Sequence, residues 1–454
     1  MRKLFKTHSL RNLLFVVVLI GVVAGLSYLA NRYLVQRDVT YNTINSLEPA
    51  SIGVLKQLDG PVTITVYATE QDVRLGDIRK IIRDFLSLYQ RYKPDIKLVF
   101  VDPSQDEERS RAAQIRFNGE MVIEYAGRSE HLTKINEPIL TSALLRLARS
   151  RDQTVMYLDG HGERKLDGVA NHDLGALFGA KLKQNGFQLG SLNLAVAQEV
   201  PNNVRVLVIT QPQLKLMPGE VDKLLRYVDR GGNLLWLVDA EPLRGLERLA
   251  EKLDLQLPPG IVIDPAATEM NAPPTWSLGA TYPPHAITRN FNLITAFPFA
   301  RPLIWNENPT DSKGSKDWQR NVLVEVAARG WVSRNKSGDK PRFDKLHDIP
   351  GPAAIAMALQ RHINDRDQRI VVVGSGAFLA NSFAGNGGNV DLGVNMVNWL
   401  ASEERFINLQ PRAAKDSKLI LSKMQLGLIS GIFLIGLPLL LVGVGIYNWR
   451  KRRA

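Results

Sequence analysis

Apolar and polar residues between positions 46 and 150 alternate with two different periods, which predicts interleaved strands and helices. Ile78, Ile82 and Phe85 recur at helical spacing, whereas runs of β-branched and aromatic residues indicate strands. A hairpin turn is expected at Ala126 and Gly127. The expected helices cover residues 46–58, 78–92 and 139–148, and the expected strands cover residues 61–68, 96–103 and the hairpin 121–133.

This order, β-α-β, then a charged segment, then β-β-α, resembles a thioredoxin-like fold. Redox proteins of that fold carry Cys-x-x-Cys after the first strand. The corresponding residues here are Thr69, Glu70, Gln71 and Asp72, and the chain contains no cysteine. We therefore interpret residues 40–150 as a thioredoxin-like domain that lacks the redox motif and acts in binding or as a spacer.

A second α/β domain is predicted over residues 151–402. Its apolar runs are continuous rather than alternating, as expected for strands covered on both faces, and amphipathic helices separate them. The pattern therefore predicts a parallel, doubly wound sheet. The strands are expected at residues 155–158, 204–209, 234–238 and 370–373.

Two helical stripes support this interpretation, one over Leu174, Leu177, Phe178 and Leu182 and one over residues 218–228. Between about residues 266 and 351 the pattern weakens and Pro, Asn, Ser and Lys become frequent, with one strand expected at residues 322–327. This segment is interpreted as a loop-rich insertion or lid.

Long uncharged apolar runs occur near both ends of the chain. Residues 13–30 would form about 27 Å of helix and residues 426–447 about 33 Å, each enough to cross a membrane. Both runs contain a pair of glycines four residues apart, a spacing that allows close helix packing in lipid. These pairs are Gly21 with Gly25 and Gly427 with Gly431. We assign transmembrane helices to residues 13–31 and 426–448, with a linker at 403–425; a cleaved signal peptide is the alternative for the first run.

Charge indicates the orientation of these helices. The tails 1–12 and 449–454 carry eight Lys or Arg and no acid, so the positive-inside rule places both tails in the cytoplasm. The net charge of +12 falls to +4 once the tails are set aside. The charge is therefore mainly a topology signal and gives no support to nucleic-acid binding.

The sequence DGHGER follows the first strand of the second domain, at the end where doubly wound sheets bind ligands. Three interpretations stay open: a catalytic or metal site that also uses His172 and Asp173, a ligand or subunit contact, and a tight turn whose side chains satisfy local backbone groups. We predict neither a catalytic residue nor a bound metal or cofactor. The candidate contact residues are Asp159, Gly160, His161, Gly162, Glu163 and Ser375.

Ser375 is the one serine on a suitable strand-to-helix turn, but its surroundings, VGSGA, differ from the Gly-x-Ser-x-Gly of hydrolases. No Gly-x-x-x-x-Gly-Lys-[Ser/Thr] is found in the sequence. If ATP drives the process in which this chain acts, another chain hydrolyses it.

A resemblance to a known family rests on the two end spans and on the sequences YLDGHGER, VRVLVIT and GNGGNVDLGVNMVNWLAS. In these features the chain resembles the gliding-motility-type auxiliary proteins of bacterial ABC transporters. The resemblance extends upstream to RDVTYNTINSLEPASIGVLKQL. It implies that the second domain is similar to a flavodoxin or class I glutamine-amidotransferase sheet. It also implies an ABC permease and an ABC ATPase as partners.

We therefore predict a non-catalytic, membrane-anchored auxiliary subunit of an ABC-type export system in the bacterial inner membrane. The bulk of the chain would face the periplasm, where it would bind substrate, an envelope protein or a polymer. The alternatives are an envelope metalloenzyme or hydrolase that uses the DGHGER loop, and a scaffold that binds the cell wall.

Overall fold

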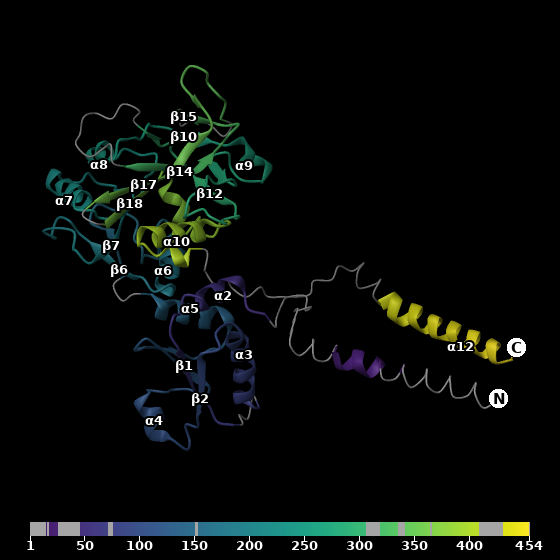
Figure 1. Cartoon of the computed structure of the whole chain (residues 1–454). Helices are drawn as coiled ribbons and strands as arrows, with labels where there is room; N and C mark the ends of the chain where they lie inside the picture. The colour runs from purple at the N-terminus through teal and green to yellow at the C-terminus, as the bar shows by residue number, and fades with distance from the viewer. Residues whose placement is uncertain are drawn as a thin grey trace. The chain divides into compact units, whose positions relative to one another are not determined.

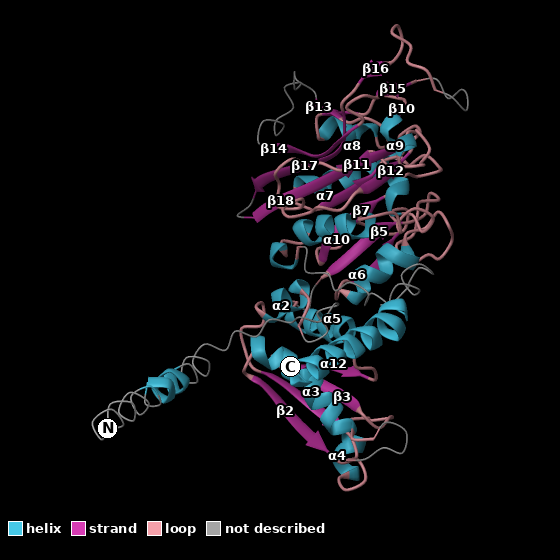
Figure 2. Cartoon of the chain, turned by 90° about the vertical axis from the view of Figure 1, so that its right-hand side faces the viewer, coloured by secondary structure: helices cyan, strands magenta, loops and turns pink. Residues whose placement is uncertain are grey.

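The computed structural model describes residues 15, 18–25, 46–70, 76–149, 153–305, 318–334, 341–363, 366–407 and 430–453. Contacts divide the chain into two units, residues 46–412 and the two ends, 1–45 with 413–454. The larger unit is mixed α/β, as predicted, and consists of two lobes that the cartoon views show (Figure 1; Figure 2).

The first lobe contains a four-stranded sheet in the order β2-β1-β3-β4. Strands β1 and β2 are parallel and the other pairs antiparallel, so the predicted order of elements is present. Ala126 and Gly127 form the hairpin turn with φ of 49° and 71°. The elements are α2 (Pro49–Leu55), β1 (Val62–Tyr67), α3 (Ile78–Tyr92), β2 (Ile96–Val101), α4 (Glu107–Ala112), β3 (Glu120–Tyr125), β4 (Arg128–Leu132) and α5 (Glu137–Ala148).

The second lobe is built on a seven-stranded sheet in the order β14-β17-β18-β8-β7-β5-β6. Its ladders from β18 to β6 are parallel, whereas β17 pairs antiparallel with both β18 and β14. The strands are β5 (Thr154–Leu158), β6 (Gln188–Leu192), β7 (Val204–Ile209), β8 (Leu234–Leu237), β14 (Gln319–Val326), β17 (Ala353–Ile363) and β18 (Arg366–Val373).

Two cores form because successive strand residues point to opposite faces of this sheet. Val206 and Val208 lie in one core, with α6 and α10, whereas Leu207 and Ile209 lie in the other, with α7 and α8. Both faces are thus covered, as the continuous apolar runs predicted. The covering helices are the π-helix η1 (Gly175–Gly179), α6 (Ala180–Gln184), α7 (Pro218–Asp229), α8 (Glu247–Lys252) and α10 (Asn389–Leu400).

The segment predicted as a loop-rich insertion requires a correction. Its expected strand is β14, but β14 is an edge strand of the main sheet and not part of a lid. The segment also forms small sheets: β11 pairs with β12, and β15 pairs with β16 and with β10, which precedes the segment. The elements just before it are β9 (Leu255–Gln256) and β10 (Ile261–Ile263), and those within it are α9 (Pro265–Glu269), β11 (Trp276–Gly279), β12 (Thr295–Pro298), β13 (Ile304–Trp305), β15 (Trp331–Ser333) and β16 (Ile349–Pro350).

One predicted apolar stripe is also corrected. Leu174, Phe178 and Leu182 are buried, but 42% of Leu177 is exposed. The reason is the π-helix η1, whose wider turn carries position 177 away from the face that a regular α-helix would bury. The lobe ends with η2 (Gly376–Leu379), α10 and η3 (Glu404–Phe406).

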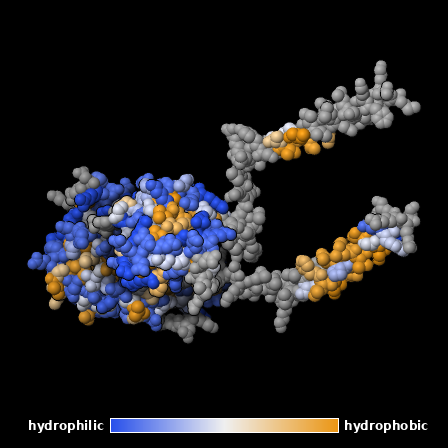
Figure 3. All heavy atoms as spheres, turned by 90° about the horizontal axis from the view of Figure 1, so that it is seen from below, coloured by the Kyte–Doolittle hydropathy of each residue, from blue (hydrophilic) through white to orange (hydrophobic). Residues whose placement is uncertain are grey.

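The C-terminal helix is the one candidate membrane span among the described residues. By length and composition, Phe433–Arg450 is suited to cross a membrane, and Figure 3 shows its apolar surface. It lies within η4 (Ile432–Gly436) and α12 (Leu437–Arg453). The predicted first span and Gly427 lie largely outside the described residues, although Phe15 and residues 18–25 are helical. A Cβ placed on Gly21, Gly25 or Gly431 would meet no atom within 4 Å.

Candidate functional site

The parallel strands β5, β7, β8 and β18 end at a common edge of the large sheet. Ligands of doubly wound sheets bind outside the carboxyl ends of the strands, so this edge is where a ligand site would be expected. The loops that meet there are residues 159–164, 210–213, 239–241 and 374–376.

The DGHGER loop leaves β5 through a tight turn. Gly160 and Gly162 have φ of +133° and +79°, a region that residues with a Cβ rarely adopt. Glu163 folds back so that its Oε2 accepts a hydrogen bond from the His161 amide at 2.7 Å. The glycines therefore serve the turn, and the Glu163 side chain satisfies local backbone.

His161 lies between two carboxylates. Its Nε2 is 3.1 Å from Glu220 Oε2 at the start of α7, and its Nδ1 is 3.4 Å from Glu163 Oε1. The imidazole is 11% exposed and the Glu163 side chain 0%. The imidazole thus joins the DGHGER loop to the first turn of α7.

The His161 carbonyl positions a second loop. It accepts hydrogen bonds from the amides of Gln213 and Leu214, at 2.8 and 2.9 Å. The side chains of Leu214 and Met217 are 64% and 68% exposed. The motif therefore holds a short segment, residues 213–217, that presents two apolar side chains to solvent.

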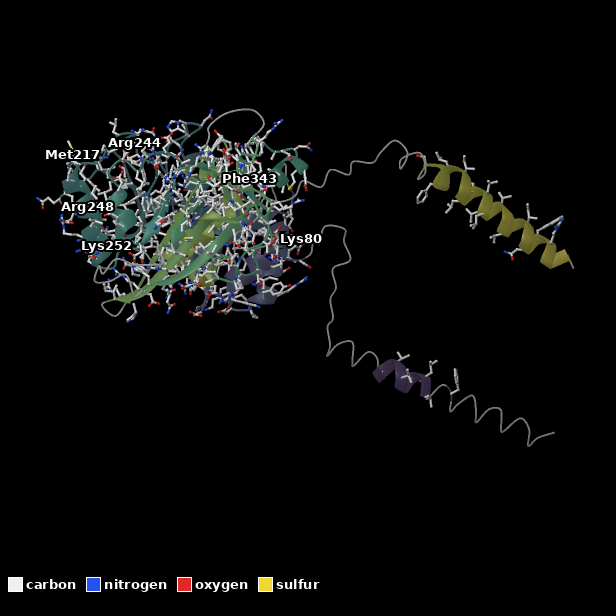
Figure 4. All side chains as sticks on the ribbon, turned by 90° about the horizontal axis from the view of Figure 1, so that it is seen from above. Lys80, Met217, Arg244, Arg248, Lys252 and Phe343 are labelled. Carbon is white, nitrogen blue, oxygen red and sulfur yellow. The ribbon has the colours of Figure 1, made fainter. Side chains whose placement is uncertain are left out.

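Basic side chains lie at the same end of the lobe as Met217 (Figure 4). These are Arg244, Arg248 and Lys252. The Leu216 amide donates to the Arg244 carbonyl at 2.9 Å, which joins residues 213–217 to the loop before α8. We refer to Leu214, Met217, Arg244 and Arg248 as the apolar-basic surface.

The other residues considered as metal ligands do not join His161. Asp159 is paired with Lys165 at 3.6 Å, and His172, 71% exposed, is 3.6 Å from Asp173 Oδ1. Among the described residues, no three His, Asp or Glu side chains are grouped as a metal site would require.

An Arg164–Asp239 ion pair, absent from the sequence-based prediction, lies at the sheet edge. Arg164 Nη1 is 2.7 Å from Asp239 Oδ2, while Asp239 Oδ1 accepts a hydrogen bond from the Gly376 amide at 2.8 Å. The pair links the loops after β5, β8 and β18. Its only sequence signal was the position of each residue shortly after a buried strand.

Arg301 closes the same edge. Its guanidinium donates to the carbonyls of Asp239 and Glu241 at 2.8 and 3.1 Å and to those of Leu257 and Pro258. Burial lowers the pKa of Arg301 to about 10, and Asp239 opposes this effect. The segment before β13 thus occupies the space over the strand ends.

Ser375 takes part in this closure. Its hydroxyl is fully buried and donates to the Pro298 carbonyl at 2.7 Å. A Cβ on the neighbouring Gly374 would collide with the Arg301 carbonyl oxygen. Ser375 and the backbone at Gly374 are therefore packed against the segment that carries Pro298 and Arg301.

Two family models match the chain. One, described as an ABC-type uncharacterized transport system, matches residues 152–403, which is more than half of the chain. The other, a domain of unknown function (DUF7088), matches residues 42–139. None of the curated proteins matches.

Two solved structures that match are distant in sequence. The N-terminal domain of mmIFT52 is 15% identical, with a TM-score of 0.40, over 54% of this chain and 97% of that one. A putative GMP synthase component from Thermoplasma acidophilum is 9% identical, with a TM-score of 0.30, over 55% of this chain and 95% of that one.

Proposed function

The chain belongs to the family of ABC-type uncharacterized transport systems, and from this premise we propose that it is a non-catalytic, membrane-anchored auxiliary subunit of an ABC export system. The observation on which the proposal rests is the match of residues 152–403 to this family. In this proposal residues 40–150 form a thioredoxin-like domain, residues 151–402 form an amidotransferase-like domain, and both termini lie in the cytoplasm.

The filled sheet edge supports a role without catalysis. Arg301 and Ser375 bond to backbone carbonyls there, and Gly376 donates to Asp239, so these groups are engaged within the chain. Opening this edge at Arg301 would break its four hydrogen bonds to backbone carbonyls, each worth about 1.5–3 kcal/mol because the donor is charged.

The apolar-basic surface supports a role in assembly. Leu214 and Met217 are exposed, and the neighbouring Arg244 and Arg248 are paired with Glu241 and Asp222 of the same chain. An apolar centre beside paired charges is complementary to a protein face with an apolar centre and a polar rim. In our proposal α12 packs on the permease, and this surface contacts a further transporter component or envelope partner outside the cytoplasm. His161 and Glu163 contribute by positioning residues 213–217.

Purification of the tagged full-length chain from native membranes in mild detergent tests the proposal. An ATPase and a polytopic permease should accompany the chain at a fixed ratio, as measured by mass spectrometry. Recovery of the chain alone, with bound metal that His161→Ala removes, would overturn the proposal in favour of an envelope metalloenzyme.

Variants test the surface within the same experiment. Leu214→Asp with Met217→Asp should reduce recovery of one co-purifying protein at least about fivefold, because charge replaces the apolar centre. Val196→Asp is the matched control, since Val196 is 84% exposed and lies outside the surface. Equal losses in both variants would remove the surface from the proposal.

A further inference from the structure

The first lobe contains a pocket of about 480 Å³ at the carboxyl end of its parallel strands. Thr69 follows β1, Ser104 follows β2, and Arg111 belongs to α4; residues 115–118 complete the wall before β3. Figure 2 shows the arrowhead of β2 directed toward α4. A volume of this size holds a small molecule or the end of a peptide.

Internal hydrogen bonds fix the wall of the pocket. Asn118 bonds reciprocally with Thr69, accepting from its amide and donating to its hydroxyl at 3.0 Å each. Glu120, which is buried, accepts hydrogen bonds from the amides of Arg116 and Phe117 at 2.8 and 3.3 Å. Burial would raise the pKa of Glu120, but the bonds from Arg116, His131 and Phe117 lower it overall. The loop is therefore held in shape before any ligand arrives.

The groups that this loop presents are an aromatic ring and a guanidinium. The Phe117 side chain is 61% exposed, and Ile115 adds a second apolar group to the wall. Arg111 is paired with Glu107 at 2.7 Å, so these two charges cancel. The side chains that line the pocket therefore carry a net charge of +1, which is that of Arg116. One net positive charge beside an apolar wall suits a monoanion with an apolar group better than a phosphate dianion.

We propose that this pocket binds a carboxylate next to an apolar side chain, the chemistry of a peptide carboxyl terminus that ends in an apolar residue. Arg116 pairs with the carboxylate through two N–H groups, and Phe117 with Ile115 contacts the side chain. This inference goes beyond the proposed function, because the ligand binds the first lobe whether or not a transporter accompanies the chain.

The test is fluorescence anisotropy on the purified full-length chain in detergent. The probe is a labelled pentapeptide that ends in Phe with a free carboxylate, compared with the same peptide ending in an amide. The free carboxylate should bind about fivefold more tightly, as expected for a partly exposed charged pair. Equal binding of both peptides, or no binding up to millimolar concentration, would overturn the proposal.

Two arginines from this part of the first lobe provide the matched comparison. Arg116→Gln should abolish the preference for the carboxylate, whereas Arg109→Gln should preserve it, because Arg109 is exposed on α4 and does not line the pocket. The same loss in both variants would indicate nonspecific charge attraction and refute the site. Thermal unfolding of each variant verifies that it is folded.

Competition with N-acetylphenylalanine then identifies the source of the carboxylate. Displacement at concentrations similar to those of the unlabelled peptide supports the site and assigns it to small carboxylic acids. Displacement only at much higher concentrations supports the site and assigns it to peptides. Displacement by inorganic phosphate at equal concentration would contradict recognition of a monoanion with an apolar group.

Discussion

Replacement of Arg301 by Ala tests whether the chain itself stabilises the closed sheet edge. Arg301 is 4% exposed, and its guanidinium donates to four carbonyls, those of Asp239, Glu241, Leu257 and Pro258. A charge-assisted hydrogen bond contributes about 1.5 kcal/mol at the lower end, so four contribute about 6 kcal/mol.

Burial of the guanidinium opposes this gain. The fall of the Arg301 pKa from its ordinary value to about 10 corresponds to about 3.5 kcal/mol at about 1.4 kcal/mol per pKa unit. The difference leaves about 2.5 kcal/mol of net stabilisation. We therefore expect Arg301→Ala to lower the free energy of unfolding by about 2.5 kcal/mol, with Arg301→Lys intermediate because an ammonium group cannot reproduce the planar fork.

Urea unfolding followed by tryptophan fluorescence measures this difference as a shift of the midpoint at constant slope. Arg329→Ala is the control, because Arg329 is 73% exposed and pairs only at the surface, with Glu269. Its expected cost is below about 1 kcal/mol. An equally small loss of stability in Arg301→Ala and Arg329→Ala would refute this reasoning. It would mean that water replaces Arg301 as the hydrogen-bond donor to the four carbonyls and that Arg301 does not stabilise this edge of the sheet.

Two further predictions concern a buried arginine and a partly buried histidine. Arg149 is 1% exposed, bonds Asn398 at 2.7 Å and lies 4.4 Å and 4.7 Å from the ring centroids of Phe187 and Phe406. Arg149→Ala should cost about 3 kcal/mol or more in urea unfolding and Arg149→Met clearly less, because Met fills the space between the rings without a buried charge; equal costs would contradict this. His285 accepts a hydrogen bond from the Ile287 amide at 3.2 Å, and burial, with Arg369 and Arg289, lowers its pKa from 6.5 to about 4. As the pH falls, the unfolded chain binds this proton before the folded chain does, so the stability that neutral His285 contributes is complete above about pH 6.5 and is lost as the pH falls through about 4. His285→Gln should therefore reduce the change of melting temperature with pH between about pH 4 and 6.5. The same pH dependence in the variant and the unmodified chain would refute the assignment.

Some elements were predictable because their pattern is local. The strands around Val206 and Leu235 are continuous apolar runs since both faces are covered, and that requirement is visible in the sequence alone. The hairpin at Ala126 and Gly127 and the stripe of α7 are likewise set by neighbouring residues.

Other elements were not predictable from local pattern. Strand β17 reads AAIAMALQRHI, and its alanines are poor strand formers that become strand because β14 and β18 pair with it on both sides. Leu177 lost its predicted burial because η1 is a π-helix, a backbone change that the spacing of apolar residues does not encode.

The sequence by itself determined the α/β class, the order of elements in the first lobe and the place of the DGHGER loop at a strand end, because these depend on residues close together in the chain. Only the tertiary structure decided what that edge contains. Arg301 bonds to Asp239, which is 62 positions away in the sequence, and the Ser375 hydroxyl bonds to Pro298, which is 77 positions away. Such contacts depend on how distant segments pack, and no local periodicity records them.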